Sequence, residues 1–188
     1  MKVFYCPAMV VDARSYSPSA AKPGLAVASW QQQGFALDLV APDPVTREQL
    51  YQAHDPAYVD SVLAGRRANG FGNRSPAVAE SLRYTSGAMV AATYAAIQSG
   101  GCACAPVSGF HHAGYDFGGG FCTFNGLLVA ALAVLGTGAA RRVGILDCDM
   151  HYGNGTDHII RHLGLQGAVR HYTAGEQDRQ ALPFLAAL

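Results

Sequence analysis

Short apolar runs alternate along the chain with longer stretches in which apolar residues recur at helical spacing. The runs are rich in β-branched, aromatic and other apolar residues, a composition that is typical of strands buried in a sheet. Strands are therefore predicted over 2–6, 102–107, 143–146 and 168–172, and a further brief apolar run occupies 36–40.

The stretches between these runs carry start and stop signals of helices. Thr46 is placed as an N-cap, Pro56 and Pro76 stand at favourable first positions, and Gly100 follows the end of the longest stretch. Helices are predicted over 47–52, 56–63, 76–98, 125–135, 156–163 and 176–188.

This alternation of strands and helices predicts an α/β fold with a parallel sheet and right-handed crossovers. No internal repeat or linker interrupts the pattern, so residues 1–188 are expected to form a single domain. Ligands of such sheets bind at the carboxyl ends of the strands. The polar loops 108–120 and 147–155 both follow apolar strands and are expected to share one site.

Composition narrows the class of protein. Half of the 188 residues are hydrophobic (50%) and 14% are charged, so a well-buried fold is expected. The 13 basic residues balance the 13 acidic ones, and nucleic-acid binding is not expected without a net positive field. The five cysteines form no CxxC pair and are expected to be reduced thiols. With no signal-peptide pattern and no bilayer-spanning apolar run, a cytoplasmic protein without membrane association is expected.

The most informative segment is D-x-D-x-H, formed by Asp147, Asp149 and His151 directly after an apolar run. Residues two apart on an extended chain point the same way, so Asp149 and His151 can face one point. A carboxylate and an imidazole suit zinc, which makes bound water a nucleophile near neutral pH. A motif this short fits equally a loop cap at Asp149 and a surface histidine. The glycines on either side of Asn154 favour the site, because they imply a tight backbone path.

A tandem histidine, His111 and His112, lies in the glycine-rich loop that follows another apolar run. Two adjacent imidazoles can supply a base and an acid to one reaction if their partners differ. Asp147 and Asn154 are candidate partners of two kinds, a carboxylate and a neutral amide. The alternative, one buried structural histidine and one exposed histidine, is the more common fate of an isolated pair.

Gly120 and Phe121 belong to a third candidate segment. Glycine lets the backbone approach a ligand closely, and a carbonyl there can accept a hydrogen bond. Phe121 could form the wall of a narrow apolar channel. The alternative is a core aromatic residue beside a flexible turn.

Three segments in register resemble the histone deacetylase family, including its bacterial acetylpolyamine amidohydrolase and acetoin-utilisation relatives. They read G-F-H-H-A-G (109–114), G-F-C-T-F-N (120–125) and L-D-C-D-M-H-Y-G-N-G-T (146–156). A weaker match, L-Y-Q-A-H-D-P-A-Y-V, lies upstream at 50–59. The resemblance implies the arginase/deacetylase fold, an open parallel sheet in a three-layer arrangement with helices on both faces.

The resemblance also implies the chemistry. The activity would be zinc-dependent hydrolysis of an acylated amine, either a small acetylpolyamine or an acetyl-lysine of a protein, and a structural K⁺ is a further expectation near Asp147. The implied roles are zinc ligation by Asp149 and His151, general base and acid at His111 and His112, support of these rings by Asp147 and Asn154, and substrate contacts at Gly120 and Phe121.

The chain also departs from the family pattern. The family's third zinc ligand, an aspartate, and its later carbonyl-polarising tyrosine or histidine have no counterpart before Leu188, so a C-terminal part of the fold is expected to be missing. An inactive short form that binds or assembles, with copies associating as a homo-oligomer, therefore remains the alternative. An arginase-like binuclear manganese hydrolase would need more carboxylates. Around Arg74 the chain offers a cation where the family often has an acid on its substrate-gripping loop.

Overall fold

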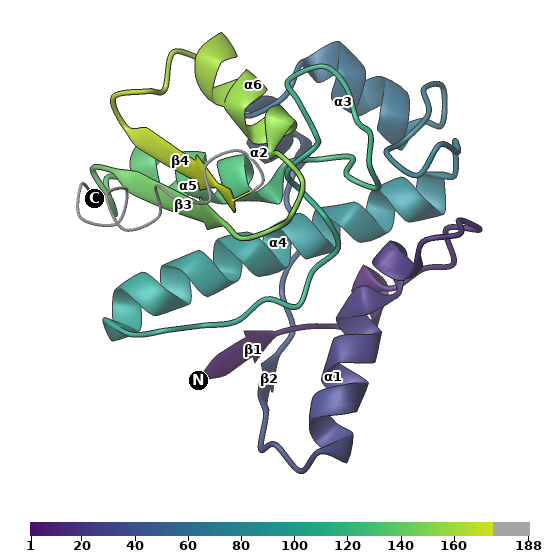
Figure 1. The fold of residues 1–188 in the computed structure, drawn as a ribbon, viewed down its shortest axis with the longest axis vertical. Helices are drawn as coiled ribbons and strands as arrows, with labels where there is room; N and C mark the ends of the chain where they lie inside the picture. Colours follow the sequence, from purple (N-terminus) through teal and green to yellow (C-terminus); the bar gives the residue numbers. More distant parts are fainter. Residues whose placement is uncertain (175–188) are drawn as a thin grey trace.

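Two separate pairs of parallel strands lie within residues 1–174, the part of the chain that the computed structural model describes (Figure 1). β1 (Lys2–Phe4) pairs with β2 (Asp38–Val40), and β3 (Val143–Asp147) pairs with β4 (Val169–Thr173). Parallel pairing agrees with the α/β interpretation. The predicted sheet is not continuous in this part of the chain, because the two pairs are not hydrogen-bonded to each other.

The prediction of a strand over 102–107 is wrong. Only Cys104 forms a bridge with β1: its N–H donates to the Lys2 carbonyl (2.9 Å), and its own carbonyl accepts from the Phe4 N–H (2.8 Å). In a parallel ladder the next donor on this side would be the residue two positions later. That residue is Pro106, which has no backbone N–H, so the ladder cannot continue.

Helices lie between and beside these strands, and several begin at the predicted caps. At the start of α2 the Thr46 side chain accepts from the Gln49 N–H, and the Gln49 side chain accepts from the Thr46 N–H. α1 was not predicted; its N-cap residue makes no side-chain capping bond. The predicted helix over 176–188 lies outside the described residues. The helices are α1 (Lys22–Gln32), α2 (Arg47–Tyr51), α3 (Pro56–Leu63), α4 (Pro76–Ser99), α5 (Gly126–Gly136) and α6 (Asn154–His162), with short 3₁₀ turns η1 (Pro7–Met9) and η2 (Pro18–Ala20).

The long helix α4 runs across the molecule between the two strand pairs (Figure 1). It packs against β1 on one side and α5 on the other, while α5 contacts β3 and α6 contacts β4. Leu39 of β2 and Leu146 of β3 nevertheless remain 41% and 46% exposed. One face of each strand pair therefore stays accessible. No helix within residues 1–174 has the length and apolar character to cross a membrane.

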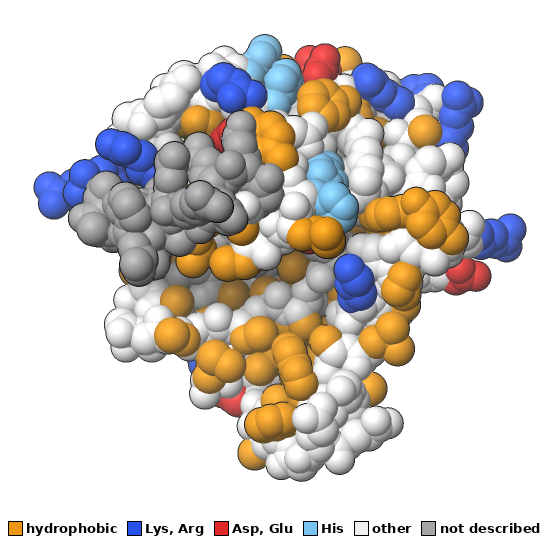
Figure 2. Space-filling model, in the orientation of Figure 1, with side chains coloured by type: hydrophobic (Ala, Val, Ile, Leu, Met, Phe, Trp, Pro, Cys, Tyr) orange, Lys and Arg blue, Asp and Glu red, His pale blue; other side chains and the backbone are white. Residues whose placement is uncertain are grey.

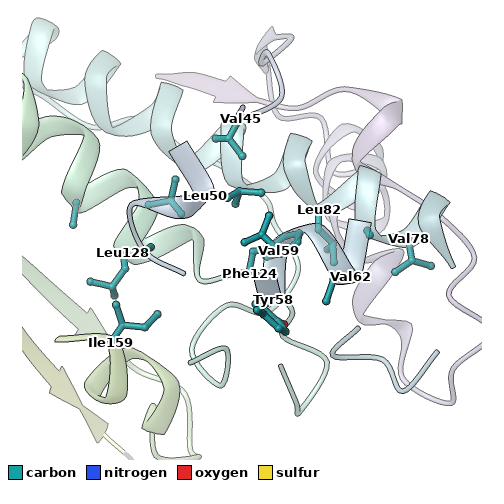
Figure 3. Packing of buried hydrophobic residues seen from close by; sticks show 14 of the residues in the cluster. Val45, Leu50, Tyr58, Val59, Val62, Val78, Leu82, Phe124, Leu128 and Ile159 are labelled. Atoms are coloured by element: carbon teal, nitrogen blue, oxygen red, sulfur yellow. The ribbon is translucent and has the colours of Figure 1, made fainter. Parts of the chain in front are cut away.

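The main hydrophobic core lies where helices α2 to α6 meet (Figure 3). A second, smaller cluster joins α4 to β1 through Phe4, Met9, Ala88 and Ala92. Burial of this kind contributes roughly 1.5–3 kcal/mol for each fully buried large apolar side chain. The residues labelled in Figure 3 show how far the main cluster extends: Val45, Leu50, Tyr58, Val59, Val62, Val78, Leu82, Phe124, Leu128 and Ile159.

A buried hydrogen-bond hub, formed by His54 and Asn125, connects these helices to the glycine-rich loop that carries the tandem histidines. His54 follows α2, and its Nδ1–H donates to the Gly114 carbonyl (2.8 Å) while its Nε2 accepts the Asn125 N–H (2.8 Å). The Asn125 side chain caps α5 by accepting from the Leu128 N–H, and its amide donates to the Ala113 carbonyl. Because the Asn125 N–H is a donor, His54 must be the neutral Nδ1–H tautomer.

Burial lowers the pKa of His54 from 6.5 to about 4. Between these values the unfolded chain binds a proton that the folded chain excludes. This contribution to stability is complete above pH 6.5 and is lost as the pH falls to about 4. We expect the free energy of unfolding to fall by about 3 kcal/mol over this range through His54 alone.

Urea unfolding at pH 7 and pH 4.5 tests this expectation, with the His54→Gln variant as the comparison. The variant should be less stable at pH 7 but should lose less stability on acidification. An NMR titration reads the same group directly. Protonation of the His54 ring above pH 5.5 in the folded protein would contradict the prediction.

Candidate active site

The tandem histidines lie side by side, each held by a different kind of partner. His111 Nδ1 is 2.7 Å from Asp147 Oδ2, and His112 Nδ1 is 2.6 Å from Asn154 Oδ1. Both partners are acceptors here, so each ring carries its proton on Nδ1 when neutral. The ring centroids are 4.0 Å apart. The two pairings proposed from the sequence are therefore both present, and each leaves an Nε2 atom for a reacting molecule.

Close backbone packing brings these pairs together. The Thr156 N–H donates to the His111 carbonyl (3.0 Å), which ties the histidine loop to the start of α6. A Cβ atom on Gly155 would lie 2.4 Å from the His112 carbonyl carbon, and one on Gly153 would lie 2.7 Å from Asp147 Oδ2. The glycines on either side of Asn154 thus leave room for the site, as expected from the sequence.

Asp147 remains ionised although its side chain is largely buried. Burial acts to raise the pKa of its carboxyl group, but the hydrogen bonds from His111 and the Asp149 N–H, together with the facing His171 ring, outweigh burial and hold that pKa well below its usual range. His111 is therefore paired with a negatively charged carboxylate, whereas His112 is paired with the neutral Asn154 amide.

Asp149 and His151 face one another at the edge of the same site. His151 Nδ1 lies 2.9 Å from Asp149 Oδ1, which also accepts the His151 backbone N–H at 2.8 Å. That backbone hydrogen bond is the main reason why the pKa of Asp149 is lowered. Both side chains are exposed, at 49% and 67%. Asp149 therefore does act as a loop cap, as the alternative interpretation expects, and its Oδ1 atom contacts the His151 imidazole directly.

An imidazole nitrogen and a carboxylate oxygen are suitable zinc ligands. Within residues 1–174, no group of three or more His, Cys, Asp or Glu side chains is arranged to hold a metal ion. Asp149 and His151 match in chemical type two of the three donors that a catalytic zinc site uses, and their role as zinc ligands remains a prediction.

These residues line a cavity of about 560 Å³. Figure 2 shows histidine side chains reaching the surface beside hydrophobic ones on the displayed face. No sequence signal indicated the contribution from η2 and the start of α1. The cavity is lined by Ser17, Ser19, Lys22, Gly109, Phe110, His111, His112, Gly120, Phe121, Cys122, Leu127, Asp147, Asp149 and His151.

Gly120 and Phe121 form the tip of a tight turn on the cavity wall. Gly119 and Cys122 exchange backbone hydrogen bonds across it, and both central residues have positive φ, 53° and 63°. Such a conformation costs a non-glycine residue roughly 1–2 kcal/mol. The Phe121 ring packs edge-on against Tyr16, with centroids 5.2 Å apart. Phe121 is therefore a cavity-wall residue rather than a fully buried core aromatic.

The same turn shows why position 120 is glycine. A Cβ atom there would lie 2.4 Å from Cδ2 of His112. The absence of a side chain at Gly120 lets the turn approach the His112 ring closely. The role of the Gly120 carbonyl as a substrate acceptor remains a prediction.

A sequence model of the histone deacetylase domain matches residues 19–169. The chain belongs to the histone deacetylase family. Acetylpolyamine amidohydrolase 1 of Pseudomonas aeruginosa is 33% identical over 185 residues, covering 76% of this chain and 52% of that protein. Acetylpolyamine amidohydrolase of Mycoplana ramosa is 48% identical over 54 residues, covering 29% of this chain and 16% of that protein.

The family fold is confirmed by a solved structure. The crystal structure of the HDA15 HD domain superimposes with a TM-score of 0.75 at 23% identity, covering 90% of this chain and 51% of that chain. The chain thus spans about half the length of this structure and of the Pseudomonas protein.

Sequence reasoning missed one residue whose side chain is buried directly behind the site. His171 of β4 lies between Asp157, at 2.7 Å, and Asp147, at 3.8 Å. Its position in an apolar run suggested only a strand. The contact depends on the pairing of β3 with β4, in which His171 stands opposite Ile145, and no local pattern indicates it.

The close packing around His112 predicts a strong effect of adding one methyl group. Gly155→Ala places a Cβ against backbone atoms that cannot easily move, and we expect a loss of about 1–3 kcal/mol in the free energy of unfolding. Gly167→Ala is the matched control, because a Cβ there has no neighbour within 4 Å. Urea unfolding at pH 7 measures both variants, and equal stability of the two would contradict the packing described here.

Proposed function

We propose that this chain carries the histidine and metal-binding part of a zinc-dependent amidohydrolase that removes an acyl group from an acylated amine. One observation carries the proposal. Two adjacent imidazoles, one on a carboxylate and the other on a neutral amide, share a cavity with a facing carboxylate–imidazole pair. Membership of the histone deacetylase family and similarity to acetylpolyamine amidohydrolases support the same activity.

The asymmetry between the two histidines assigns their roles. Asp147 places a carboxylate behind His111, and we assign this ring to take a proton from water at Nε2 as the general base. Asn154 places a neutral amide behind His112, and we assign this ring to give a proton to the leaving amine. Each Nδ1 partner also fixes the orientation of its ring, which leaves the Nε2 atoms for proton transfer.

Asp149 and His151 would hold the zinc ion. A bound zinc ion polarises an acyl carbonyl and lowers the pKa of a bound water molecule to about 7. The described residues fit this requirement in chemical type but supply only two ligands, so a third is required for the complete site. Phe121 and Leu127 would shield the acyl group from bulk water on the apolar side of the cavity.

The proposed substrate is an acetylated amine. Several relatives carry the name acetylpolyamine amidohydrolase, which indicates a small acetylated polyamine. Another relative, histone deacetylase 6 of Caenorhabditis elegans, is 49% identical over 50 residues, and its name indicates an acetylated protein. We therefore propose a small acetylpolyamine or an acetyl-lysine side chain as the substrate class.

A second candidate function is binding or assembly without catalysis. It is favoured by the presence of two, rather than three, metal donors within residues 1–174. The exposed Leu39 and Leu146 would then belong to a contact surface between copies of the chain. Sedimentation over a range of concentrations, together with metal content, separates this function from hydrolysis.

Hydrolysis of acetylputrescine and of an acetyl-lysine peptide is the direct test, using the longest form of the protein that cells produce. With zinc bound, His112→Ala should lower kcat by about 10²–10⁴-fold, because general acid–base catalysis contributes that much. His158→Ala removes a histidine that does not line the cavity and should leave kcat unchanged. A zinc-loaded protein with no activity on either substrate would exclude the proposed reaction.

Metal binding is tested separately from activity. Asp149→Ala and His151→Ala should each weaken zinc binding by at least tenfold in calorimetry, since each removes a donor. Asp12→Ala is the control, because it removes an exposed carboxylate away from the cavity lining. Equal zinc affinity in all three variants would show that the ion binds elsewhere.

A further inference from the structure

A buried histidine links the active-site carboxylate to a second carboxylate behind it. The His171 side chain is 2% exposed and projects from β4 between β3 and α6. Its Nδ1 is 2.7 Å from Asp157 Oδ1, and its Nε2 is 3.8 Å from Asp147 Oδ2. The first contact is a hydrogen bond. The second is an ion-pair distance without a direct hydrogen bond.

Asp147 Oδ2 is the same atom that contacts His111 Nδ1. One carboxylate oxygen therefore faces two imidazoles, one lining the cavity and one buried behind it. The Gly153 backbone packs against this junction: a Cβ on Gly153 would lie 2.7 Å from Asp147 Oδ2 and 2.8 Å from His171 Cε1. The carboxylate has little freedom to turn away from either ring.

The far side of His171 is also held. Asp157 Oδ2 accepts a hydrogen bond from the Tyr152 hydroxyl at 2.6 Å. The exposed Arg161 lies 3.9 Å from the same oxygen. Burial acts to lower the pKa of His171, but the two facing carboxylates outweigh it and raise that pKa. A protonated His171 can direct one N–H to Asp157 and the other toward Asp147.

We propose that His171 is a positioning residue, which by joining Asp157 to Asp147 keeps the Asp147 carboxylate aligned on His111. The role in catalysis rests on the proposed hydrolytic function, while the positioning itself does not. His171 does not line the cavity, so it acts on the reaction only through Asp147 and His111.

The test uses His171→Gln, which removes the charge and keeps a polar side chain of similar length. NMR of the histidine ring protons reads the His111 Nδ1–H bonded to Asp147. In the variant this signal should move upfield and exchange faster with water. Arg161→Gln is the matched control, because it removes a charge near Asp157 without changing either imidazole contact, and its His111 signal should stay at the native position.

Asp157→Asn is the second variant. The amide oxygen can still accept from His171 Nδ1, but the negative charge is gone, so the His111 signal should change in the same direction by less. This variant keeps the test decisive if His171→Gln does not fold. In an active form of the protein, His171→Gln should lower kcat by about 10- to 100-fold with KM unchanged, as is usual for residues that orient catalytic groups.

A folded His171→Gln protein with a native His111 signal would overturn the proposal, and so would an unchanged signal in Asp157→Asn. If the His111 signal changes but no form of the protein hydrolyses an acylated amine, the positioning role stands and the proposed function fails. If the native protein is active and neither variant changes the signal or kcat, the function stands and this inference fails.

Discussion

The structure depends on one fully buried asparagine, Asn125, whose hydrogen bonds reach four segments of the chain. Asn125 caps α5, its side-chain amide donates to the Ala113 carbonyl and to Thr156 Oγ1, and its backbone N–H donates to His54. The histidine loop, the start of α5 and the start of α6 are therefore held by one residue. Unsatisfied polar groups are costly when buried, so alternative arrangements of these loops are strongly disfavoured.

This hub explains how loops that are polar and rich in glycine can hold the two adjacent histidines in fixed positions. His111 and His112 lie directly before Ala113, the residue whose carbonyl Asn125 holds, and Asn154 lies directly before the segment that contains Thr156. The pairing of His112 with Asn154 thus follows from contacts made deeper in the core. The glycines at the site are important because they have no side chain: a methyl group at Gly120 or Gly155 would occupy the space of His112.

The ionisable side chains of the site become steadily more exposed from the core outward. His171 and Asp147 are buried, His111 lies at the inner edge of the cavity, and Asp149 and His151 are exposed at its rim. The buried groups set orientation and charge, because interactions between charges are strongest away from water. The exposed pair has the freedom to exchange its mutual hydrogen bond for a metal ion. The proposed proton-transfer and metal-binding groups thus lie in neighbouring but different environments.

The sequence by itself determined the family, the positions of most helices, and the pairing of His111 with Asp147 and of His112 with Asn154. These features are encoded locally: capping residues such as Thr46, glycines at tight turns, and motifs whose spacing is short. Even the partners of His111 and His112 could be proposed, because the D-x-D-x-H and G-N-G segments follow one strand closely. Local signals also suggested a strand at 102–107, where Pro106 allows only a single bridge to β1.

Only the tertiary structure decided which distant groups meet. His54 joins residues that are 60 and 71 positions away, and Lys22 enters the cavity from a helix that no sequence signal indicated. The contact between His171 and Asp147 requires β3 and β4 to be paired in one register. Residue patterns report periodicity and turn chemistry over a few positions, whereas these contacts depend on the path of the whole chain.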